Sequence, residues 1–395
     1  SQIPPKSPQA SGPERSRPSR VAPAAGRPIS GATGVDEATG VRFLRQWTRN
    51  ALIRLQPAEG SLDFLTPRPE SPPVDHSIDP PARDVLYCGA GPGLLRDLGL
   101  EARTEAAPGS AGNSARAERL RDLRKRYFIV AADTALAPLL HAGLAPDLAI
   151  SIDSGPGTYY HLIAAVAASA DRNGRFAFPV LSNLAGPRCL DLFFDRCYYY
   201  RSTTPLDQWL GLGPLSGVLE LQNPTRNAVG LALHIARSLG GRRLATAGAD
   251  FRGDGYRTHS NGTGYTEYAR ERVRRCYSLE MYRPGGYIRR DGATGGRRTE
   301  KNEAGYESTI RMAAEFGVEL ERPRSGNRDA RMETLLDSDR GQKEPRDLPA
   351  LQVRSLPVVE LREFLQETRS RLNRQVFADW NITARDLDRW FQILN

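Results

Sequence analysis

Apolar residues in the middle of this chain form short unbroken runs, separated by segments with helical spacing. Three runs cover residues 85–88, 127–132 and 148–152, and each leads into glycine or an acidic side chain. Residues 134–143 have the spacing of a helix that joins the second run to the third. Continuous apolar strands connected by helices are typical of buried parallel sheets, so the pattern predicts an α/β fold with a mostly parallel sheet.

The same alternation continues to about residue 320. It predicts helices at 159–170, 226–239 and 309–316, and strands at 176–182, 197–202, 244–250 and 318–320. Ligands of parallel sheets lie at the carboxyl ends of the strands. The pattern therefore favours an enzyme or a nucleotide-binding protein over a scaffold.

The segments that flank residues 84–320 differ from them in composition. Residues 1–35 contain seven prolines and almost no large apolar side chains, which predicts a disordered basic tail. Within residues 36–83 we expect an amphipathic helix at 41–55 and a proline-rich connector from 61. Polar residues at 321–350 predict a linker, and amphipathic spacing predicts C-terminal helices within 351–395.

Composition narrows the class of protein further. The chain has 395 residues, of which 39% are hydrophobic, enough for one large core. No apolar run reaches the roughly 20 residues that span a bilayer, and no secretory signal is visible. Four cysteines show no CxxC pair. We therefore expect a cytoplasmic protein with reduced thiols and no membrane span.

Positive charge is concentrated near the N-terminus and at residues 270–301, within a net charge of +9. The second segment has nine arginines and one lysine against four acidic side chains. Such a segment suits a phosphate or carboxylate ligand, or it forms a solvated basic face. No basic motif interleaved with aromatic residues is present, so nucleic acid is not an expected partner.

The glycine-rich turn GAGPG directly follows the first strand. Gly89, Gly91 and Gly93 would allow a phosphate to approach the backbone, although a plain strand-to-helix turn explains them as well. The dinucleotide-binding fingerprint is absent, since Leu94 stands where its third glycine belongs.

Acidic residues stand at the ends of three predicted strands: Asp133, Asp153 and Asp250. Carboxylates at this edge serve as metal ligands, bases or acceptors for a ribose. For Asp133 the simpler alternative is a cap on the helix that starts at Thr134.

His259 lies in a polar loop just past the strand that ends at Asp250, where an imidazole can accept a proton near neutral pH. His234 lies among apolar helix positions and is expected to be structural. The turn at 222–227 supplies Asn223, Thr225 and Asn227, which either hold a nucleotide or cap the following helix.

Three stretches together resemble the DUF115 family. They are GAGPG at 89–93, IVAADTALAPLLHAGLAPDLAISID at 129–153, and NAVGLALHIARSLGGRRLATAGADF at 227–251 with YRTHSNG at 256–262. The family includes motility accessory factors that glycosylate flagellin and archaeal pyrophosphokinase-like proteins that act on hydroxymethyl-dihydropterin. The resemblance covers roughly residues 84–320.

The resemblance implies a Rossmann-like domain similar to that of bacterial sialyltransferases, which use CMP-activated nonulosonic acids. The family's Gly–x–Asp and Thr-His pattern is matched by Gly248, Asp250, Thr258 and His259. Gly93 replaces the serine that usually ends the family's glycine turn, so the hydroxyl that this serine would offer to the nucleotide is missing.

The first hypothesis is a glycosyltransferase that moves a sialic-acid-like sugar from CMP to Ser or Thr of a flagellar or surface protein. His259 and Asp250 would be catalytic, and Thr258, Asn261 and Tyr159 would bind substrate. The nucleotide would be held by the glycine turn, by Asp153 and by the turn at 222–227.

Two alternatives remain. The first is a pterin-type pyrophosphokinase in which Asp153 and Asp250 hold Mg²⁺ for ATP; the absence of a P-loop weighs modestly against it. The second is a non-catalytic motility assembly factor on the same fold.

Overall fold

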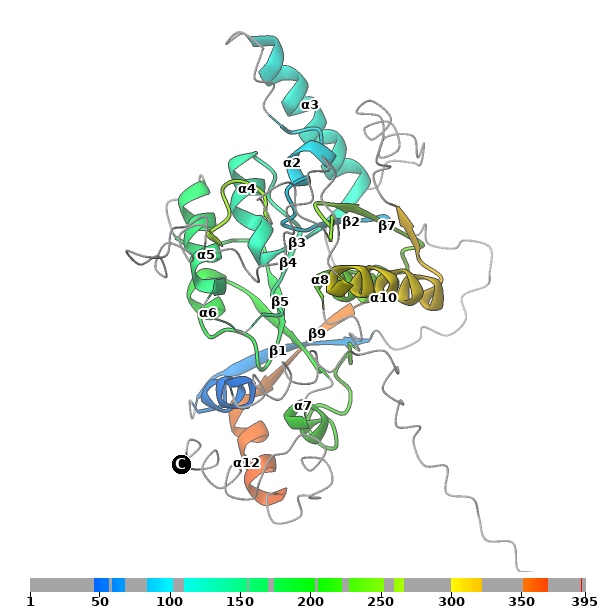
Figure 1. Cartoon of the computed structure of the whole chain (residues 1–395). Coiled ribbons are helices and arrows are strands. Elements are labelled where there is room, and N and C mark those ends of the chain that lie inside the picture. The colour runs from blue at the N-terminus through cyan, green and yellow to red at the C-terminus, as the bar shows by residue number, and fades with distance from the viewer. Residues whose placement is uncertain are drawn as a thin grey trace, which may run out of the picture.

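The computed structural model describes residues 46–56, 59–67, 84–101, 110–153, 155, 157–169, 174–202, 205–221, 227–251, 259–265, 300–321, 351–368 and 392. Strands and helices alternate along most of this length (Figure 1). After helical residues 46–54, the elements are β1 (Ser61–Pro67), β2 (Asp84–Cys88), α2 (Leu94–Asp97), α3 (Ser110–Arg126), β3 (Tyr127–Ala132), η1 (Asp133–Ala135), α4 (Leu136–His141), β4 (Leu148–Ile150), α5 (Gly157–Ala168), β5 (Val180–Asn183), α6 (Leu190–Phe193), β6 (Cys197–Tyr200), α7 (Pro205–Leu210), α8 (Ala228–Ser238), β7 (Arg243–Ala247), α10 (Glu300–Phe316), β8 (Glu319–Glu321), β9 (Leu351–Pro357) and α12 (Val358–Thr368).

The strands of the described residues form one sheet of nine, in the order β8-β7-β2-β3-β4-β5-β6-β1-β9. Every neighbouring pair runs parallel except β1 and β9, which run antiparallel. The predicted α/β class with a mostly parallel sheet is confirmed. In Figure 1, α4, α5 and α6 lie along one face, and α8 and α10 lie together on the other.

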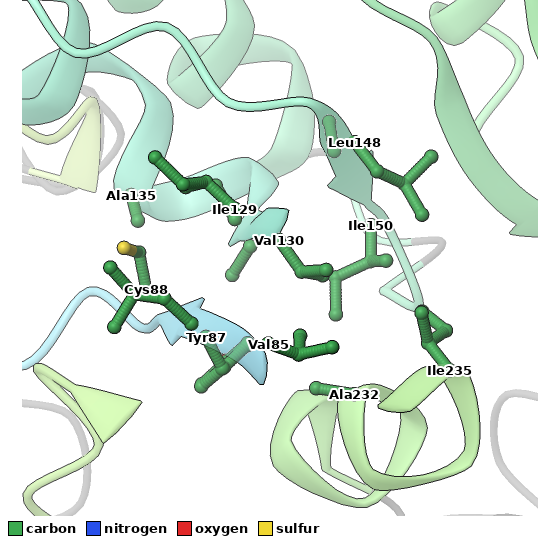
Figure 2. Packing of buried hydrophobic residues seen from close by; sticks show 14 of the residues in the cluster. Val85, Tyr87, Cys88, Ile129, Val130, Ala135, Leu148, Ile150, Ala232 and Ile235 are labelled. Carbon is green, nitrogen blue, oxygen red and sulfur yellow. The ribbon is translucent and has the colours of Figure 1, made fainter. Parts of the chain in front are cut away.

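The central strands are buried on both faces, which explains their unbroken apolar sequence. All six residues of β3 are buried, and residues 85–88 of β2 are buried beside them. Val85 is in register with Phe128, so successive side chains of the two strands alternate between the same two faces. Figure 2 shows Val85 and Ile150 on the side of the sheet where Ala232 and Ile235 of α8 pack.

A second, smaller core lies at the edge formed by β6, β1 and β9. Side chains of residues 51–55, α7 and α12 pack there around Phe64 and Tyr199, both at most 1% exposed. Tyr200, the next residue, points into the main core instead. The alternation along β6 therefore accounts for the run of three tyrosines at 198–200.

Arg54 ties this second core to the loop that follows β5. Its guanidinium is buried and donates to the carbonyls of Leu184 at 2.5 Å, Gly186 at 3.3 Å and Pro187 at 3.1 Å. The same group lies over the ring of Tyr199, 5.1 Å from its centroid. One side chain thus fixes the path of the chain just past the carboxyl end of a strand.

Two strands lie where the sequence analysis expects none. β1 occupies the start of the predicted connector, and β9 occupies the start of the predicted C-terminal helices. Each strand is stabilised by the other, through seven paired positions almost 300 residues apart in the chain. The prolines just beyond β1 and the exposed polar side chains of β9 mask the strand pattern of each segment, which is stabilised by this pairing and, for β1, by β6 as well.

Three further helices, α3, α6 and α7, have no counterpart among the predicted elements, and α10 begins nine residues before the helix predicted at 309–316. The other described elements lie within a few residues of their predicted positions. The helices expected at 159–170 and 226–239 are α5 and α8, and α12 is a C-terminal helix. Cys88, Cys189 and Cys197 are free thiols. Within the described helices, none is both long enough and apolar enough to cross a bilayer.

Candidate functional site

The carboxyl ends of β2 and β7 lie side by side where the strand order reverses. From β2 the chain adds β3 to β6 in one direction, and it then returns to place β7 on the other flank of β2. Open parallel sheets bind ligands at such switch points. The glycine turn at 89–93 follows β2 and Asp250 follows β7, so the fold brings these two predicted features together.

The glycine turn packs directly on the segment that follows β7. The N–H of Gly89 donates to the carbonyl of Ala247 at 2.8 Å, and that of Gly91 to the carbonyl of Gly248 at 2.7 Å. A Cβ on Gly91 would lie 2.5 Å from that same Gly248 oxygen. Glycine is required here because two backbones approach each other closely. The predicted alternative, a tight strand-to-helix turn, describes this geometry.

Asp250 braces the same turn with its carboxylate. Its Oδ2 accepts the N–H of Gly93 at 2.9 Å, while Asp97 Oδ2 accepts the N–H of Gly248 at 3.1 Å. All three glycine N–H groups are therefore bonded within the chain. The next residue, Phe251, has φ of 51°, a left-handed conformation that side-chain-bearing residues rarely adopt. Such strain persists only where surrounding contacts fix the backbone.

His259 lies in the loop at residues 259–265, beside the glycine turn. The N–H of Ser260 donates to the carbonyl of Ala90 at 2.8 Å, and the imidazole stacks on Tyr265 with centroids 4.7 Å apart. Burial and, to a smaller extent, the nearby His161 together lower the pKa of His259 to about 4. The imidazole is therefore neutral near pH 7, the state that accepts a proton.

Asp153 and Tyr159 belong to the neighbouring part of the sheet edge, after β4. Asp153 is exposed, and its Oδ1 accepts the N–H of Gly155 at 2.8 Å where α5 begins. Tyr159 is 44% exposed on α5 and packs against Tyr160 and Phe193. Both side chains are exposed to solvent, and both follow the carboxyl end of β4 in the chain.

Asp133 forms a buried polar cluster at the centre of the sheet. Its carboxylate accepts from the N–H of Thr134 at 2.6 Å and from Ser151 Oγ at 2.5 Å, and it is 6% exposed. Ser182 Oγ in turn donates to the carbonyl of Ser151 at 2.8 Å. Burial raises the pKa of Asp133 to about 6, although these hydrogen bonds favour the ionised form. Asp133 bonds to its own neighbour and to β4 rather than capping α4.

Asn227 caps α8, because its Oδ1 accepts the N–H of Gly230 at 2.9 Å. The capping alternative for this turn is thus the one realised at Asn227. Asn261 is exposed in the His259 loop. Asn223, Thr225 and Thr258 lie outside the described residues, as does most of the arginine-rich segment at 270–301.

Three residues near these groups are not among the predicted candidates: His161, Asp97 and Ser151. His161 is 9% exposed on α5, where burial lowers its pKa to about 4. The sequence does not indicate a role for His161, because it lies inside an apolar helical run and is brought near His259 only by the tertiary fold. Ser151 stands two residues before Asp153, and a serine in an apolar run is the single sequence signal for the buried cluster.

Fold and site together define an α/β protein of the Rossmann-like class, with its candidate site at the switch point. Neither a scan of protein-family profiles nor a search of curated proteins finds a match. A search of solved structures finds the MAf glycosyltransferase from Magnetospirillum magneticum AMB-1, with 18% identity and a TM-score of 0.37. The match covers 54% of this chain and 28% of the neighbour's length. That score is too low to establish a common overall fold.

Proposed function

We propose that this protein is a glycosyltransferase that moves a nonulosonic acid from a CMP donor to a Ser or Thr hydroxyl of a flagellar or surface protein. The observation that carries the proposal is the neutral imidazole of His259, held at the switch point beside the glycine turn. The described parts of the three stretches that resemble the DUF115 family include or directly follow β2, β4 and β7, whose carboxyl ends lie at this edge, and the resemblance supports the same activity.

The chemistry needs a base and a stabilised leaving group. The acceptor oxygen forms a bond to the anomeric carbon while the bond from that carbon to the CMP phosphate breaks, and the electron pair leaves with the phosphate oxygen. His259 takes the hydroxyl proton. An anionic donor beside the imidazole raises its pKa, which makes it a stronger base in the complex than in the free protein.

The other predicted residues divide between donor and acceptor. Asp153, exposed beside the first turn of α5, would line the nucleotide together with residues of the 222–227 turn. Tyr159 and Asn261 are exposed near the same edge and would contact the acceptor. The glycine turn would act by allowing close approach of the donor, because its own N–H groups are bonded to the β7 segment and to Asp250.

The pyrophosphokinase alternative requires Asp153 and Asp250 to share a magnesium ion. These residues follow β4 and β7, and β2 and β3 lie between those two strands. Three strand spacings separate the ends of β4 and β7 by about 14 Å, so one ion can bridge the two carboxylates only if the segments after these strands converge. Among the described residues, no group of three or more His, Cys, Asp and Glu side chains is placed to hold a metal. The separation of the two strand ends supports the transferase rather than a magnesium site shared by Asp153 and Asp250.

Calorimetric titration of the full chain with CMP, and separately with ATP and Mg²⁺, tests the proposal. Saturable binding of CMP without metal is the expected result. Binding of ATP only in the presence of Mg²⁺ would replace the transferase by the pyrophosphokinase. Binding of neither nucleotide would overturn both enzymes in favour of the assembly-factor hypothesis.

A further inference from the structure

The loop at residues 259–265 crosses the carboxyl edge of the sheet and is held on both sides. On one side, Ser260 N–H donates to the carbonyl of Ala90 in the glycine turn. On the other side, Gly264 lies against the backbone of α5 at Tyr160 and His161. The loop therefore links the element after β2 to the helix after β4, although it follows β7 in sequence.

Contact with α5 depends on the absence of a side chain at position 264. A Cβ there would overlap the carbonyl of Tyr160 and would lie 2.6 Å from the backbone nitrogen of His161. Both atoms belong to the hydrogen-bonded backbone of a 12-residue helix, which cannot move aside as a flexible side chain can. Any larger residue must lift the loop away from α5.

Docking of the loop places His259 close to His161. The side chain of His161 is 9% exposed, and its Nδ1 has no hydrogen-bond partner within the described residues. It interacts electrostatically with Asp153 and with His259. The imidazoles of His161 and His259 are therefore close enough to interact electrostatically where the loop packs on the helix.

We infer that Gly264 and His161 are positioning residues for His259: Gly264 lets the loop seat on α5, and His161 forms one wall of the space around the imidazole. This inference rests on the proposed function in one respect, which is the role of His259 as the base. Placement of the imidazole is a property of the free protein.

Ionisable groups lie on every element that packs around the His259 loop. They are Tyr160 and His161 on α5, Asp153 before that helix, Asp250 against the glycine turn and Tyr265 on the loop itself. Of these, His161 is the one that lowers the pKa of His259. A substitution at His161 therefore acts on the imidazole electrically, whereas one at Gly264 acts by exposing it.

The test is an NMR titration of the full chain labelled at its five histidines, with the His259 signal identified from its absence in His259→Ala. In Gly264→Ala the pKa of His259 should rise from about 4 toward its ordinary value of 6.5. His161→Gln should give a smaller rise, because burial remains. Gly217→Ala is the matched control, since a Cβ there has its nearest neighbour at 3.7 Å.

A His259 titration that is unchanged in Gly264→Ala would overturn the inference, provided that the variant melts as the native chain does. If Gly264→Ala fails to fold, His161→Gln decides, and an unchanged titration there has the same consequence. Failure of CMP to bind would remove the proposed function while leaving these shifts in place. If CMP binds, donor turnover in Gly264→Ala should fall at least about tenfold with CMP affinity retained.

Discussion

The backbone N–H of Gly93 donates to Oδ2 of Asp250 at 2.9 Å, joining two turns that are 157 positions apart in the chain. Together with the bond from Gly91 to Gly248, this contact joins the glycine turn after β2 to the segment after β7. Asp250 is thus a brace in the free protein. Its carboxylate fixes the conformation of the glycine turn, and through that conformation it affects how a ligand binds.

Asp250→Ala is expected to lower the free energy of unfolding by about 1–3 kcal/mol, because the N–H of Gly93 loses its acceptor. Asp250→Asn keeps an acceptor oxygen and should unfold close to the native chain. Urea unfolding measures the stability of each variant, and calorimetry measures its affinity for CMP. Native-like melting of Asp250→Asn with abolished sugar transfer would show that the charge itself takes part in the reaction, contrary to a bracing role.

Arg54→Ala should cost roughly 2–4 kcal/mol of stability, because three backbone carbonyls lose a buried donor at once. Arg54→Lys keeps the charge but has no planar fork of donors, so most of the loss should remain. Arg175→Ala is the control, since its exposed side chain pairs with Asp195 and donates to a single backbone carbonyl, that of Phe194, and these contacts together should contribute about 1 kcal/mol. Equal midpoints of urea unfolding for Arg54→Ala and Arg175→Ala would contradict a stabilising role for the three hydrogen bonds from Arg54 to the loop after β5.

The sequence predicts the centre of the fold well, because local pattern and tertiary burial agree there. The unbroken apolar run of β3 is typical of a strand that is buried on both faces of a parallel sheet. The sequence of α8 contains both an apolar face and the Asn227 cap. At the edge of the sheet, the local sequence pattern and the tertiary structure disagree. β1 and β9 depend on each other, and such a distant pairing leaves no mark in either segment alone.

Prediction of the site follows the same division. Glycine, aspartate and histidine at the ends of strands are visible in sequence, since a parallel sheet gathers strand ends at one edge. The direction of each side chain is not visible. Whether Asp250 faces a ligand or the N–H of Gly93, and whether Asn227 faces solvent or caps α8, depends on contacts across the fold. His161 and Gly264 gain meaning only from the loop that docks on α5.

Stability should depend on pH through Asp133, whose pKa is raised by burial from 3.8 to about 6. The folded state binds this proton more tightly than the unfolded state, so the contribution is full below about pH 4 and is lost as pH rises through 6. Asp133→Asn removes that loss. Its stability relative to the native chain should therefore increase by roughly 2–3 kcal/mol between about pH 4 and pH 7.

Ser151→Ala is the matched variant for that experiment. It removes the hydroxyl that donates to the ionised carboxylate, so the pKa of Asp133 should rise further and the chain should lose stability at neutral pH. Urea unfolding at several pH values measures both variants. A difference between native and Asp133→Asn proteins that stays constant with pH would mean that the carboxylate does not titrate in this range.

His259→Ala should leave CMP affinity within about threefold of the native value, while transfer of the sugar falls by about 10²–10⁴, the usual contribution of a general base. The reason is that the imidazole acts on the acceptor hydroxyl and the glycine turn on the donor. In the native chain, addition of CMP should raise the pKa of His259 above its free value of about 4, because the phosphate favours the imidazolium. Calorimetry, a donor-turnover assay and NMR titration give the three readouts. Unchanged turnover in His259→Ala with intact CMP binding would exclude the imidazole as base and leave the nucleotide site without its proposed chemistry.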